Sequence, residues 1–328
     1  MLVNTQLFQE AANRFLKKGW YTDAPPGSRE FYNYWTEELE RCRKGYTVAG
    51  TSITGHHYFY LNYCQIKLTE QIKGTSATKS IAFPHFWDGD YEYFWLMDIA
   101  RNGITPAKLK KLGLSTTVDP KYLAGGHHLI VSKARRKGFS YKNAAITTNT
   151  YNTVRNSYTL LCAFDKKYLY PKGIMTMAAA NMDFLNEHTG WSKRRSQIDK
   201  QNHKKASYLE YINSQGVEKG YKSEVEAITF KDNPDAARGK DATLVIFEEA
   251  GAFSNLKNTF MATRPTVEDG GITTGQMIIF GTGGDMDGGT IDFESMFYNP
   301  EPYNLLPVEN VWDDGGHGTQ CGWFFPSY

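Results

Sequence analysis

The first hundred residues place apolar side chains at the spacing of helices. Within 5–18 they recur every three or four positions, and Gly19 follows as a helix end. A second helix, rich in charge, is predicted over 29–43, and a third from about Gly89 onward. The segment 56–68, HHYFYLNYCQIKL, is rich in β-forming residues and predicts one or two strands. The pattern predicts a mixed helical and β subregion over 1–104.

From about residue 105 the pattern changes to short apolar runs separated by polar or helical stretches. The runs are 127–132, 173–180, 225–230, 242–249 and 276–282. Several are apolar along their whole length rather than alternating, which favours strands buried on both faces of a parallel sheet flanked by helices. We therefore expect an α/β core over 105–298.

Two stretches lack this pattern. The long polar region 190–224 predicts a loop or an irregular insertion. The final stretch, 299–328, contains Pro, Gly, aromatic and acidic residues but no Lys or Arg, and it predicts an extended linker.

Composition describes an ordinary globular chain. Its 328 residues are 41% hydrophobic and 22% charged, which suits one large or two modest domains with a real core. The net charge of +2 excludes a strongly basic protein, so a nucleic-acid signal has to come from local clusters. No apolar run approaches the ~18 residues of a membrane span, and the first residues lack a signal-peptide core. We expect a soluble, cytoplasmic protein without membrane contact.

The cysteines point to the same compartment. The 4 cysteines, Cys42, Cys64, Cys162 and Cys321, are far apart and form no CxxC pair. This spacing favours buried free thiols in a reducing compartment over a zinc site or a disulfide framework.

The stretch VSKARRKGFSYKN, residues 131–143, carries the first candidate chemistry. An apolar run precedes it and a potential helix follows, as in a phosphate-binding loop. Gly138 supplies the small residue and Ser140 a hydroxyl for Mg²⁺, but Phe139 stands where such a loop usually has lysine. The cations that could replace that lysine precede it: Lys133, Arg135, Arg136 and Lys137. Taken alone, the segment favours a basic, solvated turn between a strand and a helix over a phosphate loop, because the usual G-K-[ST] ending is absent.

A second motif, ATLVIFEEAGAF at 242–253, runs four apolar residues into Glu248 and Glu249. Adjacent carboxylates at the end of a buried strand are costly unless they have a role. In a nucleotide hydrolase the first helps to hold Mg²⁺ and the second polarises the attacking water. A solvated acidic turn is the alternative, which the phosphate-loop candidate upstream makes less attractive.

A third motif, QMIIFGTGGDMDGG at 276–289, ends a predicted strand in Gly281, Thr282, Gly283 and Gly284. A small polar residue at this place can sense the γ-phosphate, and Thr282 fits that role. A flexible glycine loop is the alternative.

Two further features stay open. The region 190–222 is rich in cations with interleaved aromatics, which suits sequence-independent contact with a phosphate backbone as well as it suits a solvated loop. Its cations are Lys193, Arg194, Arg195, Lys200, Lys204, Lys205, Lys219 and Lys222. His127 and His128 lack the spacing of metal ligands, so a metal role is disfavoured.

The order of LIVSKARRKGFSYKNA, DAARGKDATLVIFEEAG and MIIFGTGG resembles the ATPase domain of bacteriophage large terminase subunits. The resemblance covers roughly 55–328 and implies a P-loop fold of the ASCE type, with an additional strand and a catalytic glutamate. Phe139 in place of lysine and Glu248 in place of the usual aspartate depart from the family pattern.

The resemblance also implies a function. It implies ATP hydrolysis with Mg²⁺ that drives double-stranded DNA into a procapsid, by a homo-oligomeric ring that works with a portal protein and a small terminase subunit. The place of action would be the portal vertex in the host cytoplasm, outside the finished virion. A full large terminase also carries a nuclease domain, for which this chain has no room, so 299–328 is expected to be a linker toward it and nuclease activity is not expected here.

The resemblance assigns roles residue by residue. Glu249 would orient water, Ser140 and Glu248 would hold Mg²⁺, and Arg135 or Arg136 would act as an arginine finger. The loop that cradles ATP would comprise Lys133, Ala134, Arg135, Arg136, Lys137, Gly138, Phe139, Ser140 and Tyr141. Arg238 is a candidate for reaching a neighbouring subunit's nucleotide. Gln65 and Phe86 are candidates for the adenine side, with simple core packing as the alternative.

Two rival classes remain at this stage. One is another P-loop ATPase, such as a helicase. The other is a non-enzymatic DNA-binding or capsid-assembly protein, in which the two glutamates would have no catalytic role.

Overall fold

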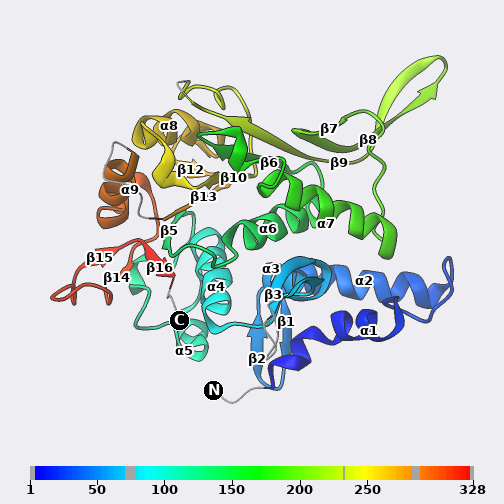
Figure 1. Cartoon of the computed structure of the whole chain (residues 1–328), viewed down its shortest axis with the longest axis horizontal. Helices are drawn as coiled ribbons and strands as arrows, with labels where there is room; N and C mark the ends of the chain where they lie inside the picture. The colour runs from blue at the N-terminus through cyan, green and yellow to red at the C-terminus, as the bar shows by residue number, and fades with distance from the viewer. Residues whose placement is uncertain (1–3, 71–77, 232, 283–288, 326–328) are drawn as a thin grey trace.

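The computed structural model describes residues 4–70, 78–231, 233–282 and 289–325 (Figure 1). Its centre is an eight-stranded sheet in the order β16-β5-β13-β10-β6-β9-β8-β7. The strands are β5 (Leu129–Lys133), β6 (Tyr158–Ala163), β7 (Asp199–Lys200), β8 (His203–Ile212), β9 (Gln215–Thr229), β10 (Leu244–Glu248), β13 (Gln276–Gly281) and β16 (Trp323–Phe325). From β16 to β9 neighbouring strands run parallel, and β8 and β7 complete the sheet antiparallel. The predicted α/β class with a mainly parallel sheet is confirmed.

The middle of this sheet explains the apolar runs. Every residue of β10 and β13 is buried, and so are four of the five in β5. These strands are covered on both faces, so they need no alternation of polar and apolar residues. β13 lies between β5 and β10 in the sheet.

Helices lie on both faces of the sheet (Figure 1). On one face are α6 (Phe139–Thr153) and α7 (Ile174–His188), and on the other α8 (Leu256–Thr263) and α9 (Gly289–Tyr298). Short elements join them: η3 (Lys166–Tyr168), η4 (Ala250–Ala252), η5 (Arg264–Thr266), β11 (Glu268–Asp269), β12 (Ile272–Thr273), η6 (Glu301–Tyr303), β14 (Val308–Glu309) and β15 (Gln320–Cys321). None of the helices in the described part of the chain combines the length and apolar character that crossing a bilayer requires.

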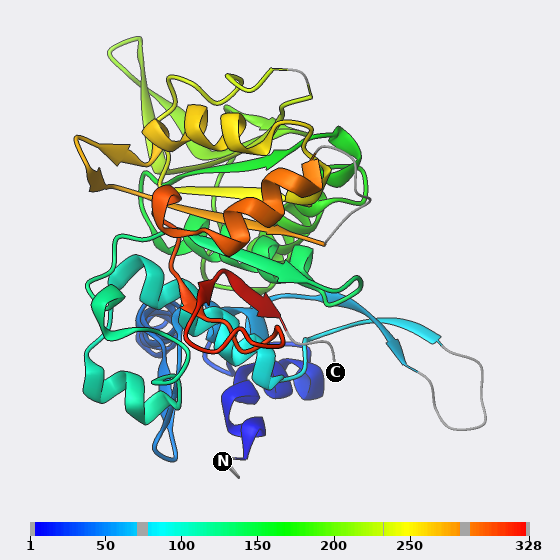
Figure 2. The ribbon, with the colours of Figure 1, turned by 90° about the vertical axis from the view of Figure 1, so that its left-hand side faces the viewer.

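The N-terminal subregion packs against the outer side of α6 and α7 (Figures 1 and 2). Its elements are η1 (Thr5–Gln9), α1 (Glu10–Lys18), α2 (Arg29–Lys44), β1 (Tyr46–Val48), β2 (Thr51–Ile53), α3 (Gly55–Tyr63), β3 (Ile66–Glu70), β4 (Thr78–Ala82), α4 (Asp88–Asn102), α5 (Pro106–Leu112) and η2 (Pro120–Tyr122). Ser28 and Thr54 cap α2 and α3 through their side-chain oxygens, which accept hydrogen bonds from backbone amides of the first turns. The helices predicted over 5–18, over 29–43 and from about Gly89 are confirmed.

Three expectations about individual elements are wrong. The segment 56–68 begins with a helix, α3, and only its last three residues belong to a strand, β3. Thr54 caps this helix and all of its residues except His56 are buried, so burial overrides β propensity. The run 173–180 belongs to α7, since a short continuous apolar run suits a buried helix as well as a buried strand. The polar region 190–224 is no loop, because β8 and β9 pair there in a long antiparallel hairpin that projects from the sheet (Figure 1).

The end of the chain differs from a linker as well. Trp323–Phe325 forms β16, which pairs in parallel with β5, and the side chains of Trp323 and Phe325 are buried. Part of 299–328 therefore belongs to the core sheet. The 4 cysteines are buried and free, as predicted.

Candidate functional site

The basic loop and the acidic pair meet at one edge of the sheet. β5 and β10 run in the same direction with β13 between them, so their carboxyl ends open at the same edge. There the Ser140 hydroxyl donates a hydrogen bond of 2.6 Å to Oε1 of Glu248, and the Lys133 ammonium forms an ion pair with Glu249. Residues more than a hundred positions apart in the sequence are thus in direct contact.

The loop between β5 and α6 has the backbone of an anion site. Gly138 precedes α6 with a φ of 70°, in the left-handed region that glycine adopts at little cost. The first backbone amides of a helix have no partner inside the helix and carry a partial positive charge. The start of α6 can therefore receive a phosphate group.

Phe139, at the position where lysine was expected, belongs to the core. Its side chain is buried, and its ring centroid lies 4.9 Å from that of Tyr93, 5.7 Å from Phe280 and 4.8 Å from Phe325. The ring anchors the first residue of α6 between the sheet and α4. Phe139 thus fixes the loop from inside the protein, and its side chain is not available to an anion.

Glu248 is a buried acid with one oxygen left over. Burial raises the pKa of its carboxyl to about 8; Glu249 adds to the rise, while the Ser140 hydrogen bond and Lys133 oppose it. Its Oε2 has no hydrogen-bond partner among the described residues. Such a group is stable as a carboxylate only if a positive charge joins it.

The donor set at Glu248 fits Mg²⁺. This ion takes oxygen ligands and is usually held by one or two protein oxygens together with water and substrate phosphates. The free Oε2 of Glu248 and the adjoining Ser140 hydroxyl offer such oxygens. Within the described part of the chain, no cluster of three or more His, Cys, Asp or Glu side chains forms a protein-only metal cage.

Glu249 has an unusual backbone. Its φ of 49° places a non-glycine residue in the left-handed region directly after β10. Such a conformation costs about 1–3 kcal/mol and persists where the surroundings hold it. Gly281, at the end of β13, leaves room for this turn, since a Cβ there would lie 2.9 Å from the Gly251 nitrogen. The Thr282 hydroxyl is 3.5 Å from Oε2 of Glu249, at the outer limit of a hydrogen bond.

The other predicted residues are placed as follows. Arg135 and Arg136 are exposed at the turn of the loop, and Ala134, Lys137 and Tyr141 are half-buried beside it. Arg238 is 70% exposed and pairs with Asp235 in its own turn at 3.0 Å. Gly283 and Gly284 lie outside the described residues.

The adenine-side candidates remain predictions. Gln65 is half-buried. Phe86 stacks on Phe8 and on His57, with centroid distances of 5.7 and 5.0 Å, as expected for a residue that packs in the core.

A buried pair beneath the loop was not predicted from the sequence. Lys142, on α6, forms an ion pair of 3.0 Å with Asp90, on α4, and both side chains are almost wholly buried. The Lys142 ammonium also donates a hydrogen bond to the backbone carbonyl of Lys137, in the loop. A lysine one helical turn beyond the start of the helix that follows the loop, on an otherwise uncharged helix, was the signal in the sequence.

Four of the eight cations named in 190–222 form ion pairs with acidic side chains. Arg195 pairs with Asp183 and Asp199, Lys204 with Asp199, Lys205 with Glu218 and Glu224, and Lys219 with Glu210. Lys193 is half-buried and donates a hydrogen bond to Asn152, and desolvation lowers its pKa to about 8. Fewer of these cations are available to a phosphate backbone than the sequence indicated. Contact of the hairpin with a nucleic acid stays a prediction.

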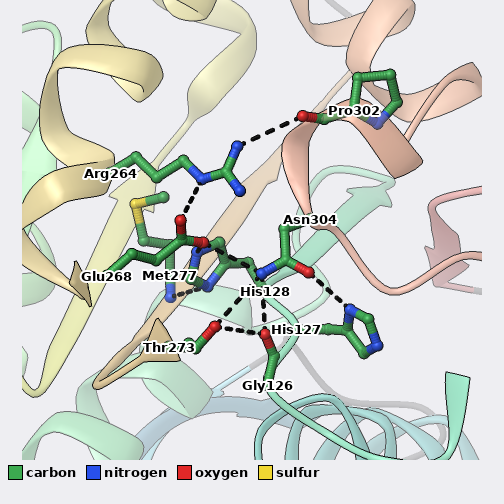
Figure 3. Close-up of polar contacts among 9 residues, drawn as sticks. All are labelled: Gly126, His127, His128, Arg264, Glu268, Thr273, Met277, Pro302 and Asn304. Atoms are coloured by element: carbon green, nitrogen blue, oxygen red, sulfur yellow. Dashed lines mark hydrogen bonds and ion pairs between the residues drawn. The ribbon is translucent and has the colours of Figure 1, made fainter. Parts of the chain in front are cut away.

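His127 and His128 lie at the opposite end of β5 from the loop, in a closed polar network (Figure 3). The Met277 amide donates to Nδ1 of His128 at 3.2 Å, so Nε2 carries the proton and donates to Glu268 at 3.0 Å. Arg264 and Asn304 also donate to Glu268, at 2.6 and 3.1 Å. Both nitrogens of His128 are thereby occupied, which agrees with the expectation that it is not a metal ligand.

Comparison with known proteins gives only distant structural similarity. No protein-family model and no curated protein matches the chain. Among solved structures, it is similar to the Thermus phage P74-26 large terminase ATPase domain, with 14% identity over 60% of this chain and 74% of that one at a TM-score of 0.42. A variant of that domain in which one arginine is replaced by alanine is also similar, with 15% identity over 61% of this chain and 75% of that one at a TM-score of 0.43.

The HK97 bacteriophage large terminase is also similar, with 13% identity over 64% of this chain and 42% of that one at a TM-score of 0.38. These solved structures come from the family that the motif order resembles. At such values no residue role is carried from one chain to another, so the roles below rest on this chain's own geometry.

Proposed function

We propose that this chain is an ATPase motor domain that uses Mg²⁺ and drives double-stranded DNA into a phage procapsid. One observation carries the ATPase part: the hydroxyl that follows the phosphate-loop glycine is bonded to the first of two glutamates at the end of a strand two places away in the sheet. A solvated turn, or a pair of glutamates without a catalytic role, would not require the hydrogen bond between Ser140 and Glu248.

Each group in the site has a defined task. The amides at the start of α6 bind the phosphates, and Ser140 and Glu248 hold Mg²⁺, which would neutralise charge on the β- and γ-phosphates. Glu249 orients and polarises the water for in-line attack. Lys133, beside Glu249, places a positive charge close to the γ-phosphate, where the missing loop lysine would act.

Three further residues act at the edge of this site. Arg135 and Arg136 are exposed on the loop and free to turn toward a phosphate, with which a guanidinium forms paired hydrogen bonds. Thr282 adjoins Glu249 and would sense whether a γ-phosphate is present. Arg238 is exposed and would reach the nucleotide of a neighbouring subunit in a ring.

The biological setting rests on the motif order, which resembles phage large terminases. In that setting the domain assembles as a ring on a portal protein, works with a small terminase subunit, and translocates double-stranded DNA in the host cytoplasm. Adenine would bind beside Gln65 and Phe86.

Steady-state ATP hydrolysis tests the proposal. Wild type and Glu249→Gln are compared with Mg²⁺, double-stranded DNA and portal protein present, and Glu294→Gln, an exposed glutamate on α9, is the matched control. We expect Glu249→Gln to lose about 100-fold or more in turnover, the usual range for a positioned general base, while the control keeps wild-type activity. Wild-type turnover no faster than that of Glu249→Gln would overturn the proposal.

A further inference from the structure

Lys142 reaches back from α6 to the underside of the phosphate loop. It lies three residues after Phe139, so both project from the same side of the helix, and helical side chains point toward the N-terminus. Its ammonium donates to the carbonyl oxygen of Lys137 and pairs with Asp90 at 3.0 Å. The contact joins the loop to α4, an element of the N-terminal subregion.

Aromatic rings enclose the same ammonium. It lies 4.9 Å from the ring centroid of Phe139 and 4.8 Å from that of Phe325, on β16. Rings at this distance attract a cation, the more so where water is excluded. A carboxylate, a carbonyl and two rings thus surround Lys142 inside the protein, so its charge acts on the loop rather than on a bound phosphate.

The bond to Lys137 determines where the next amide points. In a planar trans peptide unit the C=O and the following N–H point in opposite directions. With the Lys137 carbonyl held beneath the loop by Lys142, the N–H of Gly138 is turned to the other side. A carbonyl that swung outward would present a negative dipole to a phosphate and remove that amide from it.

A buried ion pair alone would not explain this arrangement. Two charges taken out of water gain little net stability, and apolar residues of similar size often replace such a pair without loss. The contact with Lys137 gives the charged pair a use that an apolar pair would lack.

We propose that Lys142 is a positioning residue for nucleotide binding: it holds the Lys137 carbonyl inward so that the loop amides face the phosphates. The inference rests on the proposed ATPase function and deepens it. Asp90 compensates the charge of the buried ammonium.

Three variants of the full chain separate this role from simple support of the fold. Asp90→Leu with Lys142→Met removes both charges at similar volume and keeps the helix contact apolar. Lys142→Met alone leaves the Asp90 carboxyl buried without its partner, and Asp90→Asn keeps the Lys142 bond to Lys137. We expect the melting temperature to fall in Lys142→Met and to stay near wild type in the double variant.

Hydrogen exchange of the peptide covering 133–141 reads the loop without any nucleotide. We expect exchange about tenfold faster than wild type in both Lys142 variants and near wild type in Asp90→Asn. Equal exchange in wild type and in both Lys142 variants would overturn the inference, and so would equal loosening in Asp90→Asn and Lys142→Met. If the double variant does not fold, the comparison of Asp90→Asn with Lys142→Met still decides.

ATP kinetics then link the loop to function. Loop amides bind substrate and transition state alike, so we expect the double variant to raise KM for ATP about tenfold with kcat changed less than about threefold. A loss of folded protein would instead lower kcat, and an unchanged KM would contradict the positioning role. If wild type neither binds nor hydrolyses ATP, the proposed function is wrong. If the loop of the double variant still exchanges faster than that of wild type in that case, Lys142 nevertheless positions the loop.

Discussion

The two ends of β5 are built on opposite principles. At the amino end, His128, Glu268, Arg264 and Asn304 satisfy one another in a closed network of hydrogen bonds (Figure 3). At the carboxyl end, Glu248 is buried and one of its oxygens has no partner among the described residues, and Glu249 has a left-handed backbone conformation. At the amino end several donors compensate Glu268, whereas at the carboxyl end Lys133 pairs with Glu249 and Glu248 keeps one oxygen available for a cation.

The pKa values of the two acids express this difference. Burial alone would raise the pKa of Glu268, but hydrogen bonds from His128, Arg264 and Asn304 outweigh it and lower the pKa to about 2. Burial raises the pKa of Glu248 to about 8 and Glu249 adds to the rise, which the Ser140 hydrogen bond and Lys133 do not offset. A charge that the fold has already compensated contributes to stability, whereas an uncompensated one is ready for a ligand of opposite charge.

Removing the acid at the amino end should produce the largest loss of stability. Glu268→Ala leaves the Arg264 guanidinium and the proton-bearing Nε2 of His128 without their acceptor. We expect the free energy of unfolding to fall by about 3 kcal/mol, the lower end of the range for breaking a buried charged pair. Chemical denaturation measures the change, and ATP affinity should stay at the wild-type value.

The matched control for that variant is Glu210→Ala. Glu210 is exposed on the hairpin and lies 3.8 Å from Lys219, so its removal should cost less than about 0.5 kcal/mol. A loss at Glu268 no larger than this would mean that the amino-end network adds nothing, and the contrast between the two ends would disappear.

Removing the Ser140 hydroxyl at the carboxyl end should lower ATP affinity and leave stability almost unchanged. Ser140→Ala removes one of the two proposed Mg²⁺ ligands and the hydrogen bond that Ser140 donates to Glu248. Burial raises the pKa of Glu248, and a protonated carboxyl depends less on that hydrogen bond than a carboxylate does. We expect Mg²⁺-dependent ATP affinity to fall about 10- to 100-fold, with a melting temperature close to wild type. Titration calorimetry with and without Mg²⁺ measures the effect; equal loss under both conditions would place Ser140 outside the metal site.

The sheet could be predicted from the sequence because its middle strands are apolar throughout. The runs 242–249 and 276–282 are too short and too apolar for surface helices, and both end in residues with chemical roles. The run 173–180 has the same appearance, yet it lies in α7, because only the continuation of buried positions to Leu185 distinguishes a buried helix from a strand.

The site could be predicted in part. The pairing of Ser140 with Glu248 follows from two motifs whose strands end at one edge of a sheet. The contact of Asp90 with Lys142 does not follow, since nothing in the sequence indicates that α4 would lie beneath the loop. The hairpin of β8 and β9 was missed for another reason: its alternating charges pair across the strands, and in the sequence they read as a solvated loop.

Acid should weaken the amino end in two stages. Burial lowers the pKa of His128 below its usual 6.5, although Glu268 opposes this, so the unfolded chain takes up a proton first as the pH falls below about 6.5. Glu268, with its pKa held near 2 against 4.5 in the open chain, loses its stabilising effect as the pH falls from about 4.5 toward 2. Stability contributed by both groups is therefore complete above about pH 6.5 and decreases on the acid side.

Unfolding free energies as a function of pH check this for wild type and Glu268→Gln. The amide cannot titrate, so the variant should show a shallower fall than wild type below about pH 4.5. Arg264 and His127 are the other charged or titratable groups that face His128 and Glu268, and both are unchanged in the variant. Parallel curves in that range would show that Glu268 is not held ionised by its neighbours.

The smallest effect on activity is expected at Thr282, whose hydroxyl adjoins Glu249 at the carboxyl end. Its hydroxyl reaches Glu249 at 3.5 Å, too far for a strong bond, so Thr282→Val should leave the melting temperature unchanged. If Thr282 senses the γ-phosphate, turnover should nevertheless fall about three- to tenfold while affinity for ADP, which lacks that group, stays the same. An equal loss of ADP affinity would show that Thr282 supports the site as a whole. The carboxyl end would then be held together by internal contacts as well, as the amino end is.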